Sequence, residues 1–375
     1  MTKPKVMILG KVPPPHIGPA VATQIILNSA LNDRYNLIHF DTKINTHVQD
    51  LGKVRFSKFK SVWDMYRRFG KTLKKMKPEV ILIPIGQTTV GFFKDLPLIR
   101  RSIKSGAKVV LHLRGSAFRT WFDALDPIRR NRVKRVLKAT HGVIVLGENL
   151  RHLFDGLYPE ERIHVVPNGG DYTFPARKNP NLRITYLANY LPGKGLAEVL
   201  EALKLLGDKP DLPTFEFVGY GQWDDEEYRR KCMAIAGDLD VRCTLNGPIS
   251  GSDKWQALAD TDIFVFAPSS PEGHPWSVVE ALAAGLPIVA TDQGAISQNV
   301  VDGKNGFLID HPQPEFLARH FETLLKDGEL RGKMGRESRN IYESGFTETA
   351  MVENLAGVFD ELLENHVRNP RNHSA

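Results

Sequence analysis

The sequence is poor in cysteine and contains no long apolar segment. Its two cysteines, Cys232 and Cys243, are too few for a disulfide framework and lack the spacing of metal ligands. No apolar run approaches the roughly 20 residues that cross a bilayer. The N-terminus, MTKPKVMILG, lacks the long apolar region and small-residue cleavage site of a signal peptide. These absences exclude a disulfide-rich secreted domain and a helical membrane protein, and we expect a protein of the reducing cytoplasm.

Positive charge is concentrated in the first half of the 375 residues. Residues 1–170 hold 30 Lys and Arg against 12 Asp and Glu, a net charge of +18, whereas residues 171–375 hold 20 and 31, a net charge of −11. The length exceeds one ordinary core and predicts two domains. The basic half is typical of a domain that faces a polyanion or an anionic surface. No known nucleic-acid motif appears among its lysines, so we expect no nucleic-acid partner.

The stretch PSSPEGHPWSVVEALAAGLPIVATD, residues 268–292, has the pattern of a βαβ unit. An apolar, β-branched run at 263–267 predicts a buried strand, and a second run at 288–290 predicts another. Between them Pro275 opens a helix at its first position, and Gly285 ends it. The unpaired N–H groups of Trp276, Ser277 and Val278 at the start of this helix, together with the helix dipole, predict a place for a phosphate.

Two carboxylates flank this helix start. Glu272 lies in the loop before it, and Glu280 lies about one and a half turns inside it. A carboxylate near a phosphate site is repelled by the phosphate, so we expect these side chains to accept hydrogen bonds from sugar hydroxyls. Two glutamates at this spacing are common on protein surfaces. With the preceding strand, the Gly-His-Pro turn and the AAGLP helix end, they form a specific pattern.

This pattern resembles the donor-binding signature of the large retaining, nucleotide-sugar-dependent glycosyltransferase family 4 (glycosyl transferases group 1, GT-B fold). The resemblance implies an α/β protein whose two Rossmann-like domains face each other across a cleft. It also implies that Glu272 contacts the transferred sugar and that Glu280 binds the nucleotide ribose. The turn between them would meet the diphosphate through Gly273, His274, Pro275, Trp276 and Ser277.

Further positions of the second half match the family in part. Relatives carry an Arg and, five residues later, a Lys on the diphosphate. Here Lys194 fits the second position, and Asn189 replaces the Arg of the first. Gly219 lies in the segment FEFVGYG, which resembles the family strand that lines the base pocket.

The first half resembles the family more loosely. Gly18 lies in a Pro/Gly loop that in relatives closes over the donor diphosphate and the acceptor. Relatives often place a His directly before the Gly of the segment HLRGS, near the transferred sugar. Here Arg114 holds that position, and His112 lies two residues earlier on the same face of a predicted strand. The sequence leaves open which of the two reaches the site.

The resemblance predicts three parts of the chain. Residues 1–172 form the basic, acceptor-binding domain, and residues 173–345 form the donor-binding domain. Residues 346–375 include a terminal helix that crosses back to the first domain.

Residues 52–77 combine ten Lys and Arg with one acid, and apolar side chains recur among them at steps of three and four. Such a helix fits an element that lies at a membrane interface. The alternative is a solvated basic helix whose apolar stripe packs in the domain core. Two further basic clusters, at 100–104 and 129–138, favour a membrane contact. The stripe consists of Phe56, Phe59, Trp63, Tyr66, Phe69, Leu73 and Met76.

Two Asp-x-Asp strings, at 238–240 and 260–262, raise the possibility of a metal-dependent sugar transferase. Such an enzyme needs the pair on a loop after a strand, and both strings precede strands instead. We therefore expect no metal.

Together these patterns lead us to expect a retaining, metal-independent glycosyltransferase that needs no cofactor. It would use a nucleotide sugar such as a UDP- or GDP-sugar and a glycan or lipid-linked glycan acceptor, in cell-surface polysaccharide or glycolipid synthesis, on the inner face of the cell membrane. Lys194 and the helix start would stabilise the leaving group, with Glu272, Arg114 and His112 near the sugar. Three alternatives stay open: an inactive sugar-nucleotide-binding scaffold, suggested by Asn189, an epimerase of the same fold, and nucleic-acid binding through the basic half, for which no known motif appears.

Overall fold

The computed structural model describes residues 2–14, 17–43, 54–207 and 209–368. The chain divides into two compact units, residues 1–167 together with 348–375, and residues 168–347.

A six-stranded parallel sheet forms the centre of the first unit. Its strand order is β2-β1-β3-β4-β5-β6, and the central strands are almost continuously buried. Buried runs of this kind are typical of parallel sheets covered on both faces. The strands are β1 (Lys5–Gly10), β2 (Asn36–Asp41), β3 (Val80–Ile85), β4 (Lys108–Leu113), β5 (Gly142–Val145) and β6 (Ile163–Val165).

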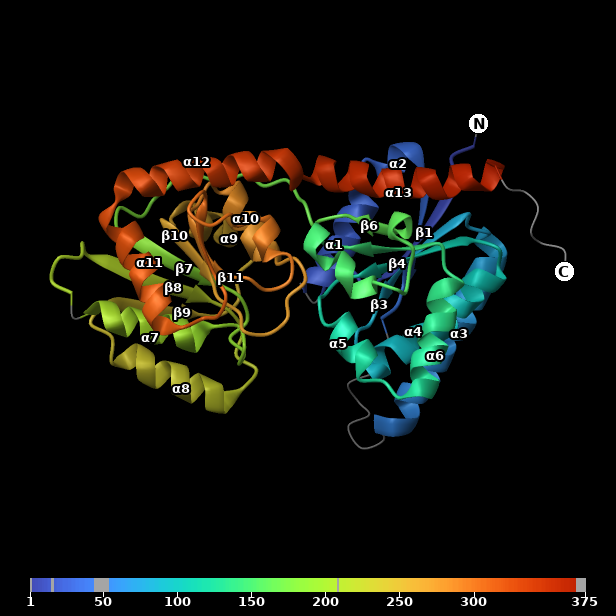
Figure 1. Cartoon of the computed structure of the whole chain (residues 1–375), viewed down its shortest axis with the longest axis horizontal. Helices are drawn as coiled ribbons and strands as arrows, with labels where there is room; N and C mark the ends of the chain where they lie inside the picture. The colour runs from blue at the N-terminus through green and yellow to red at the C-terminus, as the bar shows by residue number, and fades with distance from the viewer. Residues whose placement is uncertain (1, 15–16, 44–53, 208, 369–375) are drawn as a thin grey trace. The chain divides into compact units, whose positions relative to one another are not determined.

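Helices from both ends of the chain cover this sheet (Figure 1). The C-terminal helix belongs to the first unit, where Arg34 pairs with its Glu353 at 3.0 Å and with Asp360, and the Tyr35 hydroxyl donates to Asp360 at 2.5 Å. The helices are α1 (Gly18–Asn28), α2 (Leu31–Arg34), α3 (Val54–Met76), α4 (Thr89–Lys104), α5 (Phe118–Asp123), α6 (Pro127–Lys138) and α13 (Glu348–Arg368), with 3-10 turns η1 (Glu148–Phe154) and η2 (Glu160–Arg162).

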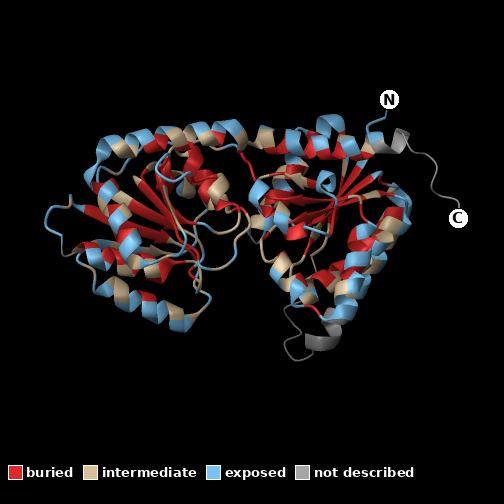
Figure 2. Ribbon diagram, viewed as in Figure 1, coloured by how far each residue is buried: buried red, intermediate tan, exposed pale blue. Residues whose placement is uncertain are grey.

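Helix α3 places much of its apolar stripe in the core. Phe69 is fully buried and meets the Phe40 ring edge-on at 4.9 Å, and Leu73 is also buried. Trp63 is 60% exposed. For Phe69 and Leu73 the core interpretation of residues 52–77 therefore holds. Most of the residues on the exposed side of the helix, pale blue in Figure 2, are Lys or Arg. The Phe56 and Phe59 side chains lie outside the part that the structure describes.

The second unit contains another six-stranded parallel sheet, in the order β12-β11-β10-β7-β8-β9. The chain enters this sheet at β7 in its centre. Strands β8 and β9 are added on one side of β7, and β10, β11 and β12 are added on the other. The strand order therefore reverses between β7 and β10. Ligands of open α/β sheets bind outside the carboxyl ends of the strands at this point. The strands are β7 (Leu182–Leu187), β8 (Phe215–Tyr220), β9 (Arg242–Asn246), β10 (Ile263–Phe266), β11 (Ile288–Thr291) and β12 (Gly306–Ile309).

Four helices of the second unit connect its parallel strands, and two more follow β12. They are α7 (Leu196–Gly207), α8 (Glu226–Gly237), α9 (Gly251–Ala259), α10 (Trp276–Ala283), α11 (Pro314–Lys326) and α12 (Gly328–Gly345), with the 3-10 turn η3 (Ile296–Gln298). Both units are therefore α/β, as predicted, and the βαβ unit expected from residues 268–292 is β10-α10-β11.

Candidate active site

The loops that follow β7 and β10 are joined to each other at the reversal point. The Ser269 and Ser270 N–H groups both donate to the Gly193 carbonyl, at 3.0 and 3.1 Å. Gly195 has φ +88°, and a Cβ there would lie 1.9 Å from the Ala267 carbonyl oxygen. Only glycine fits so close a backbone contact in this conformation. The two loops therefore form one fixed platform at the carboxyl edge of the sheet.

This platform brings together Lys194, from the loop after β7, and Glu272, from the loop after β10. The Lys194 Nζ donates to Glu272 Oε1, and the two side chains are 28% and 13% exposed. Burial raises the pKa of Glu272, and the Lys194 ammonium opposes that rise. An ammonium and a carboxylate thus meet 78 residues apart in the chain, at the reversal point, where an anionic ligand would contact the ammonium.

A second pair of this kind lies beside α10. Glu280 is 5% exposed, and its Oε1 accepts from Lys254 Nζ at 2.5 Å. Burial raises the pKa of Glu280, with Lys254 acting against it. Lys254 was missed from the sequence because α9 carries no recognised motif, and only the fold places it against α10.

The start of α10 differs in two details from the prediction. Pro275 occupies the N-cap, with φ −67° and ψ 126°, rather than the first helical position. The Val278 N–H, expected to be unpaired, donates to the Pro275 carbonyl at 3.2 Å. Trp276 and Ser277 are half-buried, and their N–H groups form no hydrogen bond within the described residues. Two backbone donors, not three, remain for an anion.

His274 lies in the core of the second unit. Its Nδ1 accepts from the Asn168 N–H at 2.9 Å, and its Nε2 contacts Asn299 Oδ1 at 2.7 Å, which places the ring proton on Nε2. The His274 carbonyl accepts from Asn168 Nδ2 at 2.7 Å. Burial lowers the pKa of His274 to about 4. The imidazole is therefore neutral and holds the turn in place. A ligand at this position would be contacted by the backbone rather than by the ring.

This support predicts an acid-sensitive second unit. The pKa of His274 is about 4 in the folded protein, and its ordinary value is 6.5. Between these two pH values the unfolded chain therefore binds a proton at His274 that the folded chain does not bind. The stabilisation is complete above about pH 6.5 and falls by ~3 kcal/mol as the pH approaches 4. We expect His274→Gln, which keeps an acceptor and a donor but cannot titrate, to flatten this dependence. Hydrogen exchange of peptides within 168–347 between pH 7 and 5 checks it, and an unchanged slope would contradict it.

The two remaining predicted site residues of this unit, Asn189 and Gly219, lie on different elements. Asn189 is exposed in the loop after β7, five residues before Lys194. Gly219 is buried in β8, where a Cβ would lie 2.8 Å from Leu245 Cδ2 and 3.0 Å from the Tyr190 hydroxyl. Gly219 thus makes room for Tyr190, whose hydroxyl donates to the Asn246 carbonyl at 2.9 Å.

In the first unit, both His112 and Arg114 lie at the carboxyl edge of the sheet. Arg114 Nη1 donates to the Pro19 carbonyl and to Thr23 Oγ1, the latter at 3.0 Å, and Nε lies 3.5 Å from His112 Nδ1. Arg114 is thereby fixed to the first turns of α1, which begins at Gly18. A cavity of about 210 Å³ adjoins Arg114.

Each of these two side chains keeps one unused polar atom. His112 Nε2 and Arg114 Nη2 are buried and have no hydrogen-bond partner within the described residues. Burial, and then the neighbouring Arg114, hold the pKa of His112 well below its usual value, and burial lowers the pKa of Arg114 to about 10. A neutral imidazole beside a charged guanidinium can therefore offer two donors to a ligand oxygen.

The carboxylates of the second Asp-x-Asp string accept hydrogen bonds from the segment that precedes β7. Asp262 accepts from both Nη atoms of Arg177 at 2.7 Å, and Asp260 accepts from the Lys178 and Asn179 N–H groups at 2.6 and 2.9 Å. They hold the segment that leads into β7. Among the residues the structure describes, no group of three His, Cys, Asp or Glu could hold a metal ion.

Comparison with known proteins places this geometry in a family. Residues 174–341 match the model of the family described as "Glycosyl transferases group 1". The matched residues make up nearly all of the second unit, residues 168–347. The match spans the two joined loops, both lysine–glutamate pairs and the start of α10. Across the described residues, no helix combines the length and apolar character needed to cross a membrane.

Curated relatives of this chain match over part of their length. The chain is 34% identical over 173 residues to spore coat protein SA of Bacillus subtilis, covering 45% of this chain and 46% of that one. It is 30% identical to the phosphatidyl-myo-inositol mannosyltransferase of Mycolicibacterium smegmatis, over 42% and 40%. It is 25% identical to the lipopolysaccharide 1,2-N-acetylglucosaminetransferase of Salmonella typhimurium, over 60% and 62%. The chain thus spans about half the length of these relatives.

Solved structures resemble the whole chain. A glycosyltransferase from Rickettsia africae has a TM-score of 0.75 at 14% identity and covers 97% of this chain and 100% of its own. Sucrose-phosphate synthase of Thermosynechococcus elongatus has 0.77, also at 14%, with the same coverage. Anabaena HepE in complex with UDP-glucose has 0.70 at 17%, covering 95% and 99%. These likenesses confirm the predicted GT-B fold.

Proposed function

We propose that this chain is a retaining, metal-independent glycosyltransferase that moves a sugar from a nucleotide diphosphate donor to a glycan or lipid-linked glycan. One observation carries the proposal. The Lys194–Glu272 and Lys254–Glu280 pairs flank a helix start whose Trp276 and Ser277 N–H groups are free of protein partners within the described residues. Groups that can donate hydrogen bonds to a phosphate thus lie beside carboxylates that can accept hydrogen bonds from sugar hydroxyls. A sugar diphosphate requires both. HepE binds UDP-glucose on the same fold, which supports a nucleotide-sugar donor.

In the proposed reaction the donor diphosphate lies at the α10 start and contacts Lys194. The bond between the anomeric carbon and the diphosphate oxygen breaks, and the electron pair goes to the departing nucleotide diphosphate. Lys194 and the two backbone donors stabilise that growing charge. Glu272 accepts hydrogen bonds from the transferred sugar, and Glu280 accepts from the ribose. The acceptor hydroxyl attacks the same face of the sugar and forms the new glycosidic bond, and its proton passes to the departing diphosphate oxygen.

The test is a screen of UDP-, GDP- and dTDP-sugars for binding and for hydrolysis without acceptor. We expect one donor class to bind and to release nucleotide diphosphate slowly, with unchanged rates in EDTA. Binding without any turnover, with or without glycan acceptors, would instead support the scaffold suggested by Asn189. An isomerised sugar nucleotide formed without acceptor would support the epimerase. Loss of the activity in EDTA would overturn the metal-independent mechanism.

We also propose that the first unit docks on the anionic inner face of the cell membrane to reach a lipid-linked acceptor. Its support is the net charge of +18 on residues 1–170 and three exposed apolar side chains, Trp63 at 60%, Val90 at 82% and Ile128 at 81%. Each basic residue near an anionic leaflet contributes ~1 kcal/mol, within about a Debye length.

Vesicle sedimentation checks this docking. We expect binding to phosphatidylglycerol vesicles but not to phosphatidylcholine vesicles, with loss at high salt. Arg67, Lys71 and Lys75, exposed on α3, changed together to Glu should remove binding and leave donor hydrolysis intact. The matched control changes three exposed cations of the second unit to Glu: Arg230, Lys231 and Lys333. Indifference to lipid charge, or tighter binding to DNA or RNA than to vesicles, would contradict the docking.

A further inference from the structure

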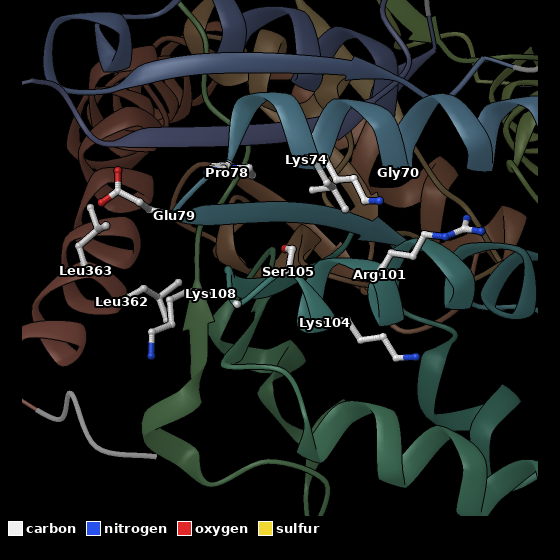
Figure 3. Close-up of a pocket in the computed structure, with 13 residues that line it drawn as sticks. Gly70, Lys74, Pro78, Glu79, Arg101, Lys104, Ser105, Lys108, Leu362 and Leu363 are labelled. Carbon is white, nitrogen blue, oxygen red and sulfur yellow. The ribbon is translucent and has the colours of Figure 1, made fainter. Parts of the chain in front are cut away.

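A second cavity lies at the amino-terminal edge of the first unit's sheet, away from Arg114. It has a volume of about 650 Å³ and is bounded by the residues that precede β3 and β4, by the ends of α3 and α4, and by α13 (Figure 3). Arg114 follows the carboxyl end of β4, and a strand of six residues places the two edges ~20 Å apart. This cavity is therefore separate from the candidate active site.

Among the residues that the structure describes, five cations and one carboxylate line this cavity. The cations are Lys74, Lys77, Arg101, Lys104 and Lys108. Within the described residues none of the four lysines forms an ion pair, and Arg101 Nη1 donates to the Tyr66 carbonyl at 3.2 Å. The single acid, Glu79, already accepts from the Lys5 N–H at 3.0 Å. Like charges gathered without counter-charges repel one another, so the cavity is suited to an anion.

Lys77 ends α3 as a left-handed cap, and its N–H donates to the Leu73 carbonyl at 3.0 Å. Lys77 follows the last residue of α3 and has φ +48°, the left-handed conformation that favours glycine. At the end of α4, on the other side of the cavity, Gly106 holds the left-handed position with φ +83°. A lysine in the left-handed conformation at the end of α3 costs more stability than the glycine at the end of α4. Such costs cluster at binding sites. The cap fixes the backbone of a residue that lines the cavity.

Apart from Ser105, the uncharged part of the lining is apolar. It includes Leu73 and Pro78 near the end of α3 and Leu362 and Leu363 of α13, and none of the thirteen lining residues is aromatic. A nucleotide base would find no ring to stack on, whereas an acyl chain is matched by leucine and proline. The volume also exceeds that of a free phosphate and is in the range of sites for small organic ligands.

We propose that this cavity binds one anionic glycerophospholipid molecule. Its phosphate contacts the lysines at the ends of α3 and α4, and its glycerol and the first part of an acyl chain lie on Leu362 and Leu363. This goes beyond the proposed glycosyl transfer, because the site lies at the opposite edge of the sheet from Arg114. The exposed basic face of α3 ends at Lys74 and Lys77, so a lipid could enter from the surface proposed to face the membrane.

Titration calorimetry of the full chain with lipids that stay monomeric tests the site without any membrane. We expect saturable 1:1 binding of dihexanoyl phosphatidylglycerol, with dihexanoyl phosphatidylcholine and inorganic phosphate each at least ~10-fold weaker. Lys104→Glu with Lys108→Glu should weaken binding by ~10-fold or more, whereas the matched pair Lys134→Glu and Lys138→Glu, exposed on α6, should not. Leu363→Gln should weaken the lipid but not phosphate.

Lys77→Gly separates a binding role from a structural one. It relieves the left-handed strain, so the melting temperature should rise while lipid binding falls. Phosphate binding as tight as the lipid would show a free-anion site and overturn the lipid assignment. Equal binding of both lipids, absence of saturable binding, or unchanged binding in the Lys104 and Lys108 variant would overturn it as well. Because no bilayer is present, these outcomes are independent of vesicle docking, and donor hydrolysis, measured in parallel, stays a separate test of the proposed function.

Discussion

Glu272→Ala is expected to abolish sugar transfer while the nucleoside diphosphate alone still binds. Glu272 lies in the loop before α10, is 13% exposed at its side chain and makes its ion pair with Lys194. Its removal takes away the proposed acceptor for the sugar hydroxyls and releases the lysine from its fixed position. Loss of such orienting and charge-stabilising contacts lowers kcat by ~10²-fold or more. Transfer assays with the donor found by the screen, together with calorimetry of the free nucleotide, measure the two effects.

Glu280→Ala is the informative contrast within this prediction. Glu280 is buried against Lys254 and is assigned to the ribose, so its loss should weaken nucleotide binding by ~1–3 kcal/mol for a lost hydrogen bond to a charged group. Glu280→Gln keeps the shape and should lose less. Glu322→Ala is the matched control, because Glu322 is also paired with lysines, Lys209 and Lys326, but on α11. Equal, small effects of the Glu272 and Glu280 variants on binding and turnover would refute both assignments.

The βαβ unit around α10 was predictable because its signals are local. Apolar runs of five and three residues, a proline at the helix start and a glycine at its end mark β10, α10 and β11 within 30 residues. Gly285, at φ +69°, has the left-handed conformation expected after a helix end. The family resemblance adds the assignment of Glu272 and Glu280, which local patterns alone leave ambiguous.

Pairings between distant segments could not be predicted in this way. Lys254 precedes Glu280 by 26 residues on another helix, and no sequence pattern links them. The same holds for His274, whose two ring nitrogens are engaged by Asn168 and Asn299, so that a residue expected at the ligand serves the core. In α3 a stripe of three- and four-residue steps is the same for a core helix and an interfacial one. Only the position of the helix beside the sheet showed that Phe69 and Leu73 face the core.

The choice between His112 and Arg114 had a similar limit. Strand alternation placed both side chains on one face of the predicted strand, and in the structure Arg114 Nε lies 3.5 Å from His112 Nδ1 at the end of β4. The contact of Arg114 with Pro19 and Thr23 depends on α1 packing over the sheet, which the sequence of β4 does not contain. The two unused atoms, His112 Nε2 and Arg114 Nη2, follow from that packing.

Lys194→Ala is expected to lower turnover by ~10²- to 10³-fold, more than it weakens sugar recognition. Lys194 is the proposed side-chain cation on the departing diphosphate, and Asn189 cannot share its charge. The loss of one preorganised group that stabilises developing charge has this magnitude. Single-turnover rates and donor affinity, measured separately, check the prediction. Lys204→Ala is the control, because Lys204 lies on α7 of the same unit, is 52% exposed and pairs only loosely with Asp238, at 3.5 Å.

The variant should also change the pH dependence of transfer. Burial raises the pKa of Glu272 and the Lys194 ammonium lowers it, so removing the ammonium leaves burial alone and the pKa rises further. Glu272 then ionises only at higher pH, and the acid limb of kcat/KM should move upward, whereas Lys194→Arg should keep it. Asn189→Arg in the Lys194→Ala background should restore part of the rate by returning a cation to the same loop. Wild-type turnover in Lys194→Ala would show that the diphosphate is bound elsewhere, and an unmoved acid limb would show that Glu272 does not titrate with this lysine.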